Sequence, residues 1–158
     1  MVLKNIPLSF VLILLFVSAC DSTKKTENNY VQYVNPLIGT DFTGNTYPGA
    51  QVPFGMVQLS PDNGLPGWDR IAGYFYPDST IAGFSHTHLS GTGAGDLYDV
   101  SFMPVTLPYR EAPQPLGIYS SFSHDDESVS AGYYQVLLKD YGIHVELTAT
   151  ERCGIQRY

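Results

Sequence analysis

Hydrophobic and polar residues alternate most regularly near the end of the chain, over residues 143–150. The apolar positions there are Ile143, Val145, Leu147 and Ala149, and the polar positions are His144, Glu146, Thr148 and Thr150. A period of two is typical of a strand with one buried face and one wet face. A similar run over 133–139 precedes it, and the connection 140–142 ends in a glycine that permits a left-handed conformation. The pattern predicts an antiparallel hairpin with His144 at the surface.

Shorter apolar runs predict further strands, separated by loops rich in glycine and proline. The predicted strands are 30–34, 56–59, 81–84, 100–107 (interrupted by Pro104) and 153–158, and the loops are 38–49, 60–67 and 108–117. Together these elements predict an all-β fold, an antiparallel β-sandwich. Because 153–158 stops in mid-strand and would leave a sheet edge open, we expect the sandwich to be incomplete and the sequence to be part of a longer protein.

Residues 1–19 resemble a bacterial lipoprotein signal peptide. Lys4 supplies a positive charge, residues 8–17 are almost all apolar, and small residues precede Cys20. The apolar run is short for a membrane-spanning helix, which needs about 20 residues. We expect lipidation of Cys20 and an exported chain anchored by its lipid to a bacterial membrane, on the periplasmic or cell-surface side. An ordinary secretory signal is the alternative.

After this signal, the composition indicates a polar tether over 20–29 and a folded domain over 30–158. Hydrophobic residues make up 44% of the chain, and its 15 Gly, 11 Pro and 12 Tyr favour turns and sheet. The formal net charge of -7 argues against nucleic acid as a partner. If Cys20 carries lipid, the only other thiol is that of Cys153, which we expect to be buried in a strand or paired outside this chain.

The stretch 83–99 concentrates histidines, hydroxyls, carboxylates and four glycines. In an extended strand His86 and His88 point to the same side of the chain. Three interpretations remain open. The histidines bind a metal with Asp96 or Asp99, or they belong to a structural strand and turn, or they line a polar pocket.

A loop around the only tryptophan is the second candidate for a binding surface. Trp68 follows a Pro-Gly pair, and Asp69 comes next. An indole face can stack on a sugar ring while the carboxylate accepts hydroxyl protons, although a lone tryptophan can equally anchor the core. The acidic run 125–127, by contrast, predicts a solvated turn.

Several blocks of the sequence resemble one known family. They are 34–40 (VNPLIGT), 47–50 (YPGA), 52–62 (VPFGMVQLSPD), 83–99 (GFSHTHLSGTGAGDLYD), 132–134 (GYY) and 147–152 (LTATER). Together they are similar to the N-terminal domain of glycoside hydrolase family 92, and the resemblance covers nearly all of the chain from residue 30 onward.

The resemblance implies an exported, calcium-dependent exo-α-mannosidase that inverts the anomeric carbon of mannose-containing glycans. It also implies that an N-terminal β-sandwich meets a C-terminal (α/α)₆ domain, which supplies most calcium ligands and both catalytic carboxylates. We accordingly assign no catalytic or metal-binding residue in this sequence. On the same resemblance, the residues expected to face the sugar or the helical domain are Trp68, Asp69, His86, His88, Ser90, Gly91, Thr92 and Gly93.

Two other classes of function remain open. A surface domain that only binds carbohydrate needs the same aromatic side chain and polar loop. A small metalloenzyme could use His86 and His88. We expect the 158-residue chain by itself to be inactive as a hydrolase and poorly stable.

Overall fold

The computed structural model describes residues 29–91, 95, 97–109, 111–113 and 116–158. Within these ranges the chain forms antiparallel strands, 3₁₀ turns and no α-helix, which confirms the all-β prediction. No helix in the same ranges is long and apolar enough to cross a membrane. The predicted signal peptide, Cys20 and most of the predicted tether lie outside the described residues.

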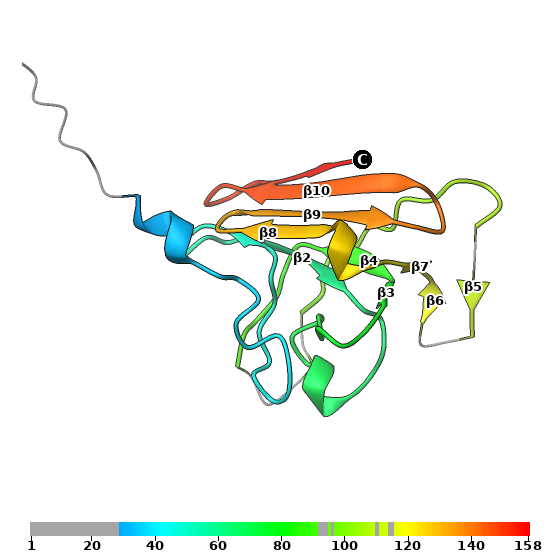
Figure 1. Ribbon diagram of the computed structural model, residues 1–158, viewed down its shortest axis with the longest axis horizontal. Helices are drawn as coiled ribbons and strands as arrows, with labels where there is room; N and C mark the ends of the chain where they lie inside the picture. The colour runs from blue at the N-terminus through cyan, green and yellow to red at the C-terminus, as the bar shows by residue number, and fades with distance from the viewer. Residues whose placement is uncertain (1–28, 92–94, 96, 110, 114–115) are drawn as a thin grey trace, which may run out of the picture.

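The larger sheet contains the predicted hairpin. Its strands are β8 (Glu127–Ser130), β9 (Tyr133–Leu138), β10 (Ile143–Ala149) and β11 (Gly154–Arg157), in the spatial order β11-β10-β9-β8 (Figure 1). The hairpin prediction is confirmed to within a residue at each strand end. Gly142 has the predicted positive φ of 63°, and His144 is exposed.

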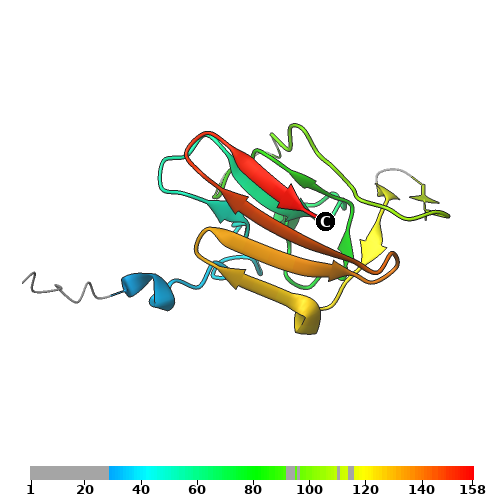
Figure 2. The same ribbon diagram turned by 90° about the horizontal axis from the view of Figure 1, so that it is seen from above.

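A smaller sheet packs under the first one and completes a two-layer sandwich (Figure 2). It contains β1 (Ala50–Gln51), β2 (Gln58–Asp62) and β4 (Gly83–Ser85) in the order β1-β2-β4. Two short pairs lie beside it, β3 (Thr80–Ile81) with β7 (Ser120–Ser121) and β5 (Glu111–Ala112) with β6 (Gly117–Ile118). Both layers fill one core, which includes Leu59, Tyr74, Phe84, Tyr134, Val136, Val145 and Leu147.

The prediction of a strand over 30–34 is wrong. Residues Tyr30–Tyr33 form a 3₁₀ helix, η1, in which the Asn29 side chain accepts a hydrogen bond from the Val31 N–H. All four residues of η1 are exposed, and the Asn29 cap stabilises this turn locally. An apolar run alone could not distinguish the two conformations.

The strand predicted over 56–59 begins later and extends through Pro61 to Asp62. Pro61 is opposite Phe84 of β4, but the ladder bonds of Phe84 go to Phe102 on its other side. Pro61 therefore lies in a non-hydrogen-bonded pair. The Pro61 nitrogen points toward the side of β2 on which β1 lies. Because β1 begins at Ala50, opposite Leu59, no residue of β1 is paired with Pro61, so the proline does not remove a ladder hydrogen bond.

Two further expectations are corrected. Only Phe102 of the predicted strand 100–107 forms a bridge, and Val100, at the start of the prediction, has a positive φ of 54° that is not extended backbone. Cys153 is exposed in the turn between β10 and β11 and is not buried in a strand.

Glu127 departs from the expectation of a solvated acidic turn. Asp125 and Asp126 are exposed, but the Glu127 side chain is 2% exposed and accepts hydrogen bonds from the hydroxyls of Tyr74 (3.0 Å) and Tyr134 (2.6 Å). His124 Nδ1 lies 2.6 Å from the same carboxylate. Burial, with the adjacent Glu127 charge, raises the pKa of both tyrosines. Glu127 is buried because it bonds to Tyr74, which is far away in the sequence, so the local sequence alone does not predict its burial.

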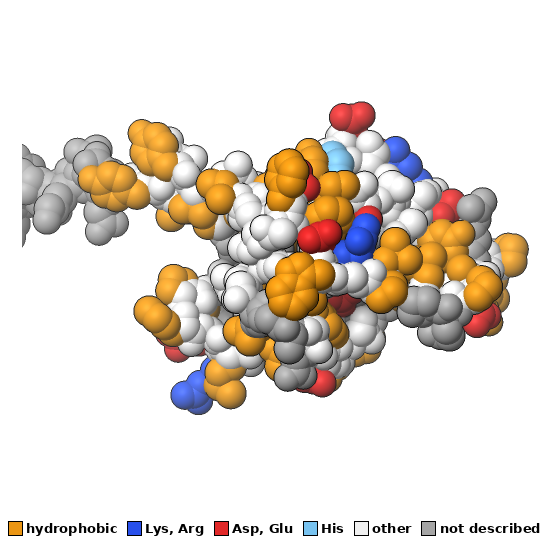
Figure 3. Space-filling model, turned by 90° about the horizontal axis from the view of Figure 1, so that it is seen from below, with side chains coloured by type: hydrophobic (Ala, Val, Ile, Leu, Met, Phe, Trp, Pro, Cys, Tyr) orange, Lys and Arg blue, Asp and Glu red, His pale blue; other side chains and the backbone are white. Residues whose placement is uncertain are grey.

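Large hydrophobic side chains remain at the surface. Figure 3 shows them spread over one face between charged groups. The most exposed are Phe54, Leu107, Phe42, Tyr33, Ile38 and Met56. Extensive exposed apolar surface on a small domain is typical of an interaction surface.

Candidate functional site

Trp68 lies on an exposed turn. The 3₁₀ helix η2 (Trp68–Arg70) begins after Gly67, whose φ of 151° favours glycine. Trp68 is 61% exposed, so within the described chain it does not anchor the core. Its ring is therefore available for contact with a ligand or another domain.

An ion pair fixes this turn to the following loop. The Arg70 guanidinium donates to both carboxylate oxygens of Asp78, with Nε to Oδ2 at 2.6 Å and a terminal nitrogen to Oδ1 at 2.5 Å. The guanidinium also lies 4.7 Å from the centroid of the Phe75 ring. A two-point pair has a defined orientation, so it restrains the backbone that carries Trp68 and Asp69.

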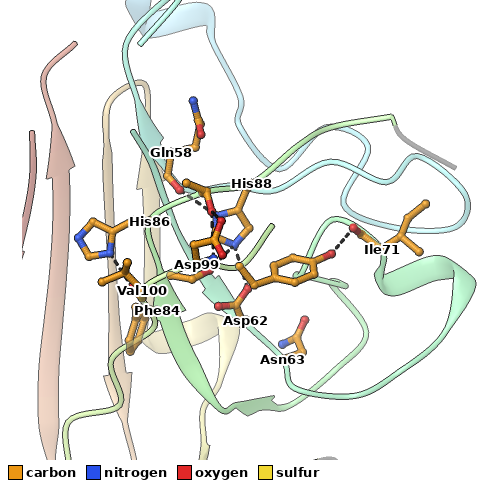
Figure 4. A network of polar contacts seen from close by, with 12 residues as sticks. Gln58, Asp62, Asn63, Ile71, Phe84, His86, His88, Asp99 and Val100 are labelled. Carbon is orange, nitrogen blue, oxygen red and sulfur yellow. Dashed lines mark hydrogen bonds and ion pairs between the residues drawn. The ribbon is translucent and has the colours of Figure 1, made fainter. Parts of the chain in front are cut away.

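His88 is buried, with only 2% of the residue exposed. Nδ1 lies 2.8 Å from the Gln58 carbonyl oxygen, and Nε2 lies 2.9 Å from Asp62 Oδ1 and 3.2 Å from Ser85 Oγ (Figure 4). Both ring nitrogens are thus occupied by partners within the protein. The ring is held behind Asp62 and does not face solvent.

His86 has different surroundings. Its Nδ1 lies 2.8 Å from the Val100 carbonyl oxygen, and its ring meets the edge of Phe102 with centroids 5.8 Å apart. Donation from Nδ1 leaves Nε2 of the neutral ring as an acceptor. Because β4 ends at Ser85, the expected alternation does not continue and the two histidines are not displayed together (Figure 4).

The polar loop after these histidines is only partly described. Ser90 and Gly91 are exposed, and the Gly91 N–H donates to the Asn45 carbonyl oxygen at 2.7 Å. Gly91 has a φ of 71°, and a Cβ there would meet nothing within 4 Å. Thr92 and Gly93 lie outside the described residues.

Among the residues that the structure describes, no group of three or more His, Cys, Asp or Glu side chains could hold a metal ion. His88 has no ring nitrogen left for such a role, because both face protein acceptors. Asp96, a possible third ligand in the metal interpretation, lies outside the described residues, and among those described the geometry of His86 and His88 does not support a metal site.

A cleft of about 440 Å³ lies beside the Trp68 loop, and sequence reasoning missed it. We call it the Asp62 cleft, and it is lined by Asp62, Gly64, Leu65, Pro66, Gly73, Ala82, Tyr98, Ser101 and Leu116. Asp62 is the only charged side chain among these. The sequence placed Asp62 in a loop, and only its position at the end of β2, beside His88, brings it to the cleft.

The site residues thus form two groups. Trp68 and Asp69 are on a turn beside the Asp62 cleft, and His88 supports that cleft from inside the core. His86, by contrast, is bonded to the segment around Val100.

Comparison with protein families gives a match to the Glycosyl hydrolase family 92 N-terminal domain over residues 33–158. Among curated proteins, an "Uncharacterized secreted glycosidase" of Arthroderma benhamiae is 30% identical over 142 residues. That match covers 84% of this chain and 17% of the fungal protein.

Solved structures give the same result. A family GH92 alpha-mannosidase from Bacteroides thetaiotaomicron, determined in complex with mannoimidazole, is 46% identical with a TM-score of 0.74. The match covers 80% of this chain and 17% of the enzyme. A family GH92 inverting mannosidase of the same organism is 32% identical with a TM-score of 0.61, over 80% of this chain and 17% of the enzyme.

Proposed function

The chain belongs to glycoside hydrolase family 92, whose N-terminal domain it contains, and on this premise we propose that it forms one wall of the sugar pocket of an exported α-mannosidase. Its relatives of solved structure include α-mannosidases, and it spans about 17% of their length. The activity therefore belongs to a longer polypeptide. Mannose-containing glycans are the proposed substrates.

We propose that the reacting carboxylates lie outside this chain. Inverting hydrolysis needs an acid and a base about 6.5–9.5 Å apart, on opposite faces of the sugar. The most buried acids described here already have partners, Glu127 with two tyrosines and Asp78 with Arg70. They have structural roles and cannot readily transfer protons to a substrate.

Calcium takes six to eight oxygen ligands, and among the described residues no group of three or more His, Cys, Asp or Glu side chains could hold a metal ion. The ligands of the calcium ion expected from the family resemblance are therefore proposed to come from a C-terminal helical domain. We assign to the residues of this chain no catalytic step that involves the calcium ion.

The proposed role of this chain is to bind and orient the sugar. The exposed Trp68 ring stacks on the apolar face of a pyranose, which contributes on the order of 1 kcal/mol beyond burial. Asp69 accepts hydroxyl protons at the same turn, and Nε2 of His86 is a further acceptor. Ser90, Gly91, Thr92 and Gly93 are proposed to contact the sugar or the helical domain.

Export and membrane attachment are also proposals. The curated relative described as secreted supports export. The small residues before Cys20 support lipidation of its thiol. Replacement Cys20→Ala should release the protein from the membrane fraction, and full retention of the variant there would contradict the anchor.

The observation that carries the proposed function is the exposed Trp68 in a chain of this family. In the longest reading frame that contains the chain, Trp68→Ala should lower kcat/KM for an aryl α-mannoside about fivefold, through loss of stacking. Tyr33→Ala, at an exposed aromatic of η1, is the matched control and should have no effect. An unchanged kcat/KM for Trp68→Ala would contradict the pocket-wall role.

A non-catalytic carbohydrate-binding domain is the second candidate, since the exposed indole beside a cleft suits binding without catalysis. A reading frame that continues into a long helical region rich in Asp and Glu favours the enzyme. A stop codon after Tyr158 favours the binding domain.

A further inference from the structure

We propose that the Asp62 cleft is a second sugar-binding site, with Asp62 as the acceptor for hydroxyl groups of a neutral pyranoside. The identity of the ligand as a mannoside rests on the proposed function, whereas the cleft and its acceptor rest on the geometry alone.

The Asp62 carboxylate is held in a fixed direction. Oδ1 lies 2.9 Å from Nε2 of His88, and the His88 ring is fixed in turn by the Gln58 carbonyl. The Asp62 backbone carbonyl accepts from the Ala82 N–H at 2.8 Å. Among the described residues Oδ2 has no hydrogen-bond partner, and the side chain is 15% exposed. A preoriented carboxylate with a free oxygen can bind a ligand hydroxyl without rearrangement.

Glycines keep this carboxylate accessible. Gly73 has a φ of 88°, and a Cβ there would lie 2.6 Å from Asp62 Oδ1 and 3.0 Å from the Tyr98 ring. Gly64, with a φ of 78°, packs against Ala82 in the same way. Any side chain at Gly73 would therefore fill the space directly in front of the acid.

The walls of the cleft select a neutral ligand. Apart from Asp62 they are mainly apolar, with Leu65, Pro66, Ala82 and Leu116. No lysine or arginine is among the described lining residues, so an anion would find no counter-charge. One carboxylate is too few oxygens for calcium, whereas apolar walls with one acceptor suit the two faces of a sugar ring.

The Asp62 cleft adjoins the turn that carries Trp68. Leu65 and Pro66 precede η2, and Gly73 follows it, so both ends of this loop line the cleft. A sugar bound at Asp62 therefore lies at the base of the Trp68 loop, and an oligosaccharide can contact both.

The test is a titration of the isotope-labelled protein encoded by the longest reading frame that contains the chain with methyl α-D-mannopyranoside, followed by NMR at the amides of Gly64, Gly73 and Ala82. We expect these amides to shift. Asp62→Asn should weaken binding about tenfold or more, because a hydrogen bond to a charged acceptor is lost. Ser101→Leu, which puts a larger side chain on the lining of the cleft, should weaken binding as well and remains informative if Asp62→Asn misfolds. Asp125→Asn, at an exposed acid, is the matched control and should bind normally.

Absence of shifts at all three amides, or an affinity equal to that of the unmodified protein in both cleft variants, overturns the inference. Calcium chloride alone producing the same shifts also overturns it, in favour of a cation site. A longer protein that hydrolyses mannosides without a cleft response would contradict only this inference. Sugar binding at the cleft without any hydrolysis by the longer protein would contradict only the enzymatic proposal.

Discussion

His86 and His88 are two residues apart in the sequence, yet the fold gives them different roles. The ring of His88 is enclosed between Gln58 and Asp62, whereas His86 lies closer to the surface with one contact to the Val100 carbonyl. The family resemblance led to the expectation that both histidines face the sugar or the helical domain. The two side chains have different surroundings because β4 ends at Ser85, before either histidine. A sequence motif does not show where a strand ends.

This difference predicts unequal losses of stability. His88→Ala should lower the free energy of unfolding by about 3 kcal/mol, because it leaves the Asp62 carboxylate without its buried partner. His86→Ala should cost about 1 kcal/mol or less, as expected for one hydrogen bond. The measurement is the urea midpoint of each variant, and equal losses would contradict the assignment.

Buried tyrosines predict the response to alkaline pH. Burial raises the pKa of Tyr47 from 10.0 to about 12, and burial beside Glu127 raises that of Tyr74 and Tyr134 further. Since the folded pKa values are higher than the unfolded ones, their contribution is complete below pH 10 and is lost as pH rises through 12 and beyond.

We therefore expect the buried tyrosines to ionise only above pH 10, together with loss of circular dichroism. Tyr47→Phe should make the fall in stability between pH 10 and 12 shallower. Ionisation of every tyrosine in one phase while the fold persists would contradict this prediction.

At the scale of elements, the sequence predicted what depends on local pattern. The period of two over 143–150 gave the hairpin β9–β10, and Gly142 marked its turn. Local pattern failed at Pro61, whose place in β2 depends on where β1 begins, and at Glu127, whose burial depends on Tyr74 far away in sequence. The Asp62 cleft was missed for the same reason.

The η2 turn gives a prediction at this scale. In Arg70→Lys the two-point contact with Asp78 becomes a single contact, so the turn that carries Trp68 should loosen. We expect a loss of stability of about 1–2 kcal/mol and lower fluorescence anisotropy of Trp68, the only tryptophan in the chain.

Arg152→Lys, at an exposed arginine between β10 and β11, is the control and should change neither quantity. If Arg70→Lys likewise left the anisotropy unchanged, the ion pair would not position the turn.

At the scale of the whole molecule, a small sandwich exposes many large apolar side chains and carries an exposed tryptophan on a turn beside a cleft. Its relatives of solved structure include mannosidases about five times as long, since 80% of this chain covers 17% of their length. This combination fits a domain that binds and orients a substrate while another part of the polypeptide performs the reaction.

The most direct test is turnover of an aryl α-mannoside by two proteins, the 158-residue chain and the longest reading frame that contains it. The account predicts no turnover by the chain alone, and turnover with inversion at the anomeric carbon by the longer protein. Hydrolysis by the 158-residue chain itself, or a longer protein that folds but cleaves no α-mannoside, would contradict it.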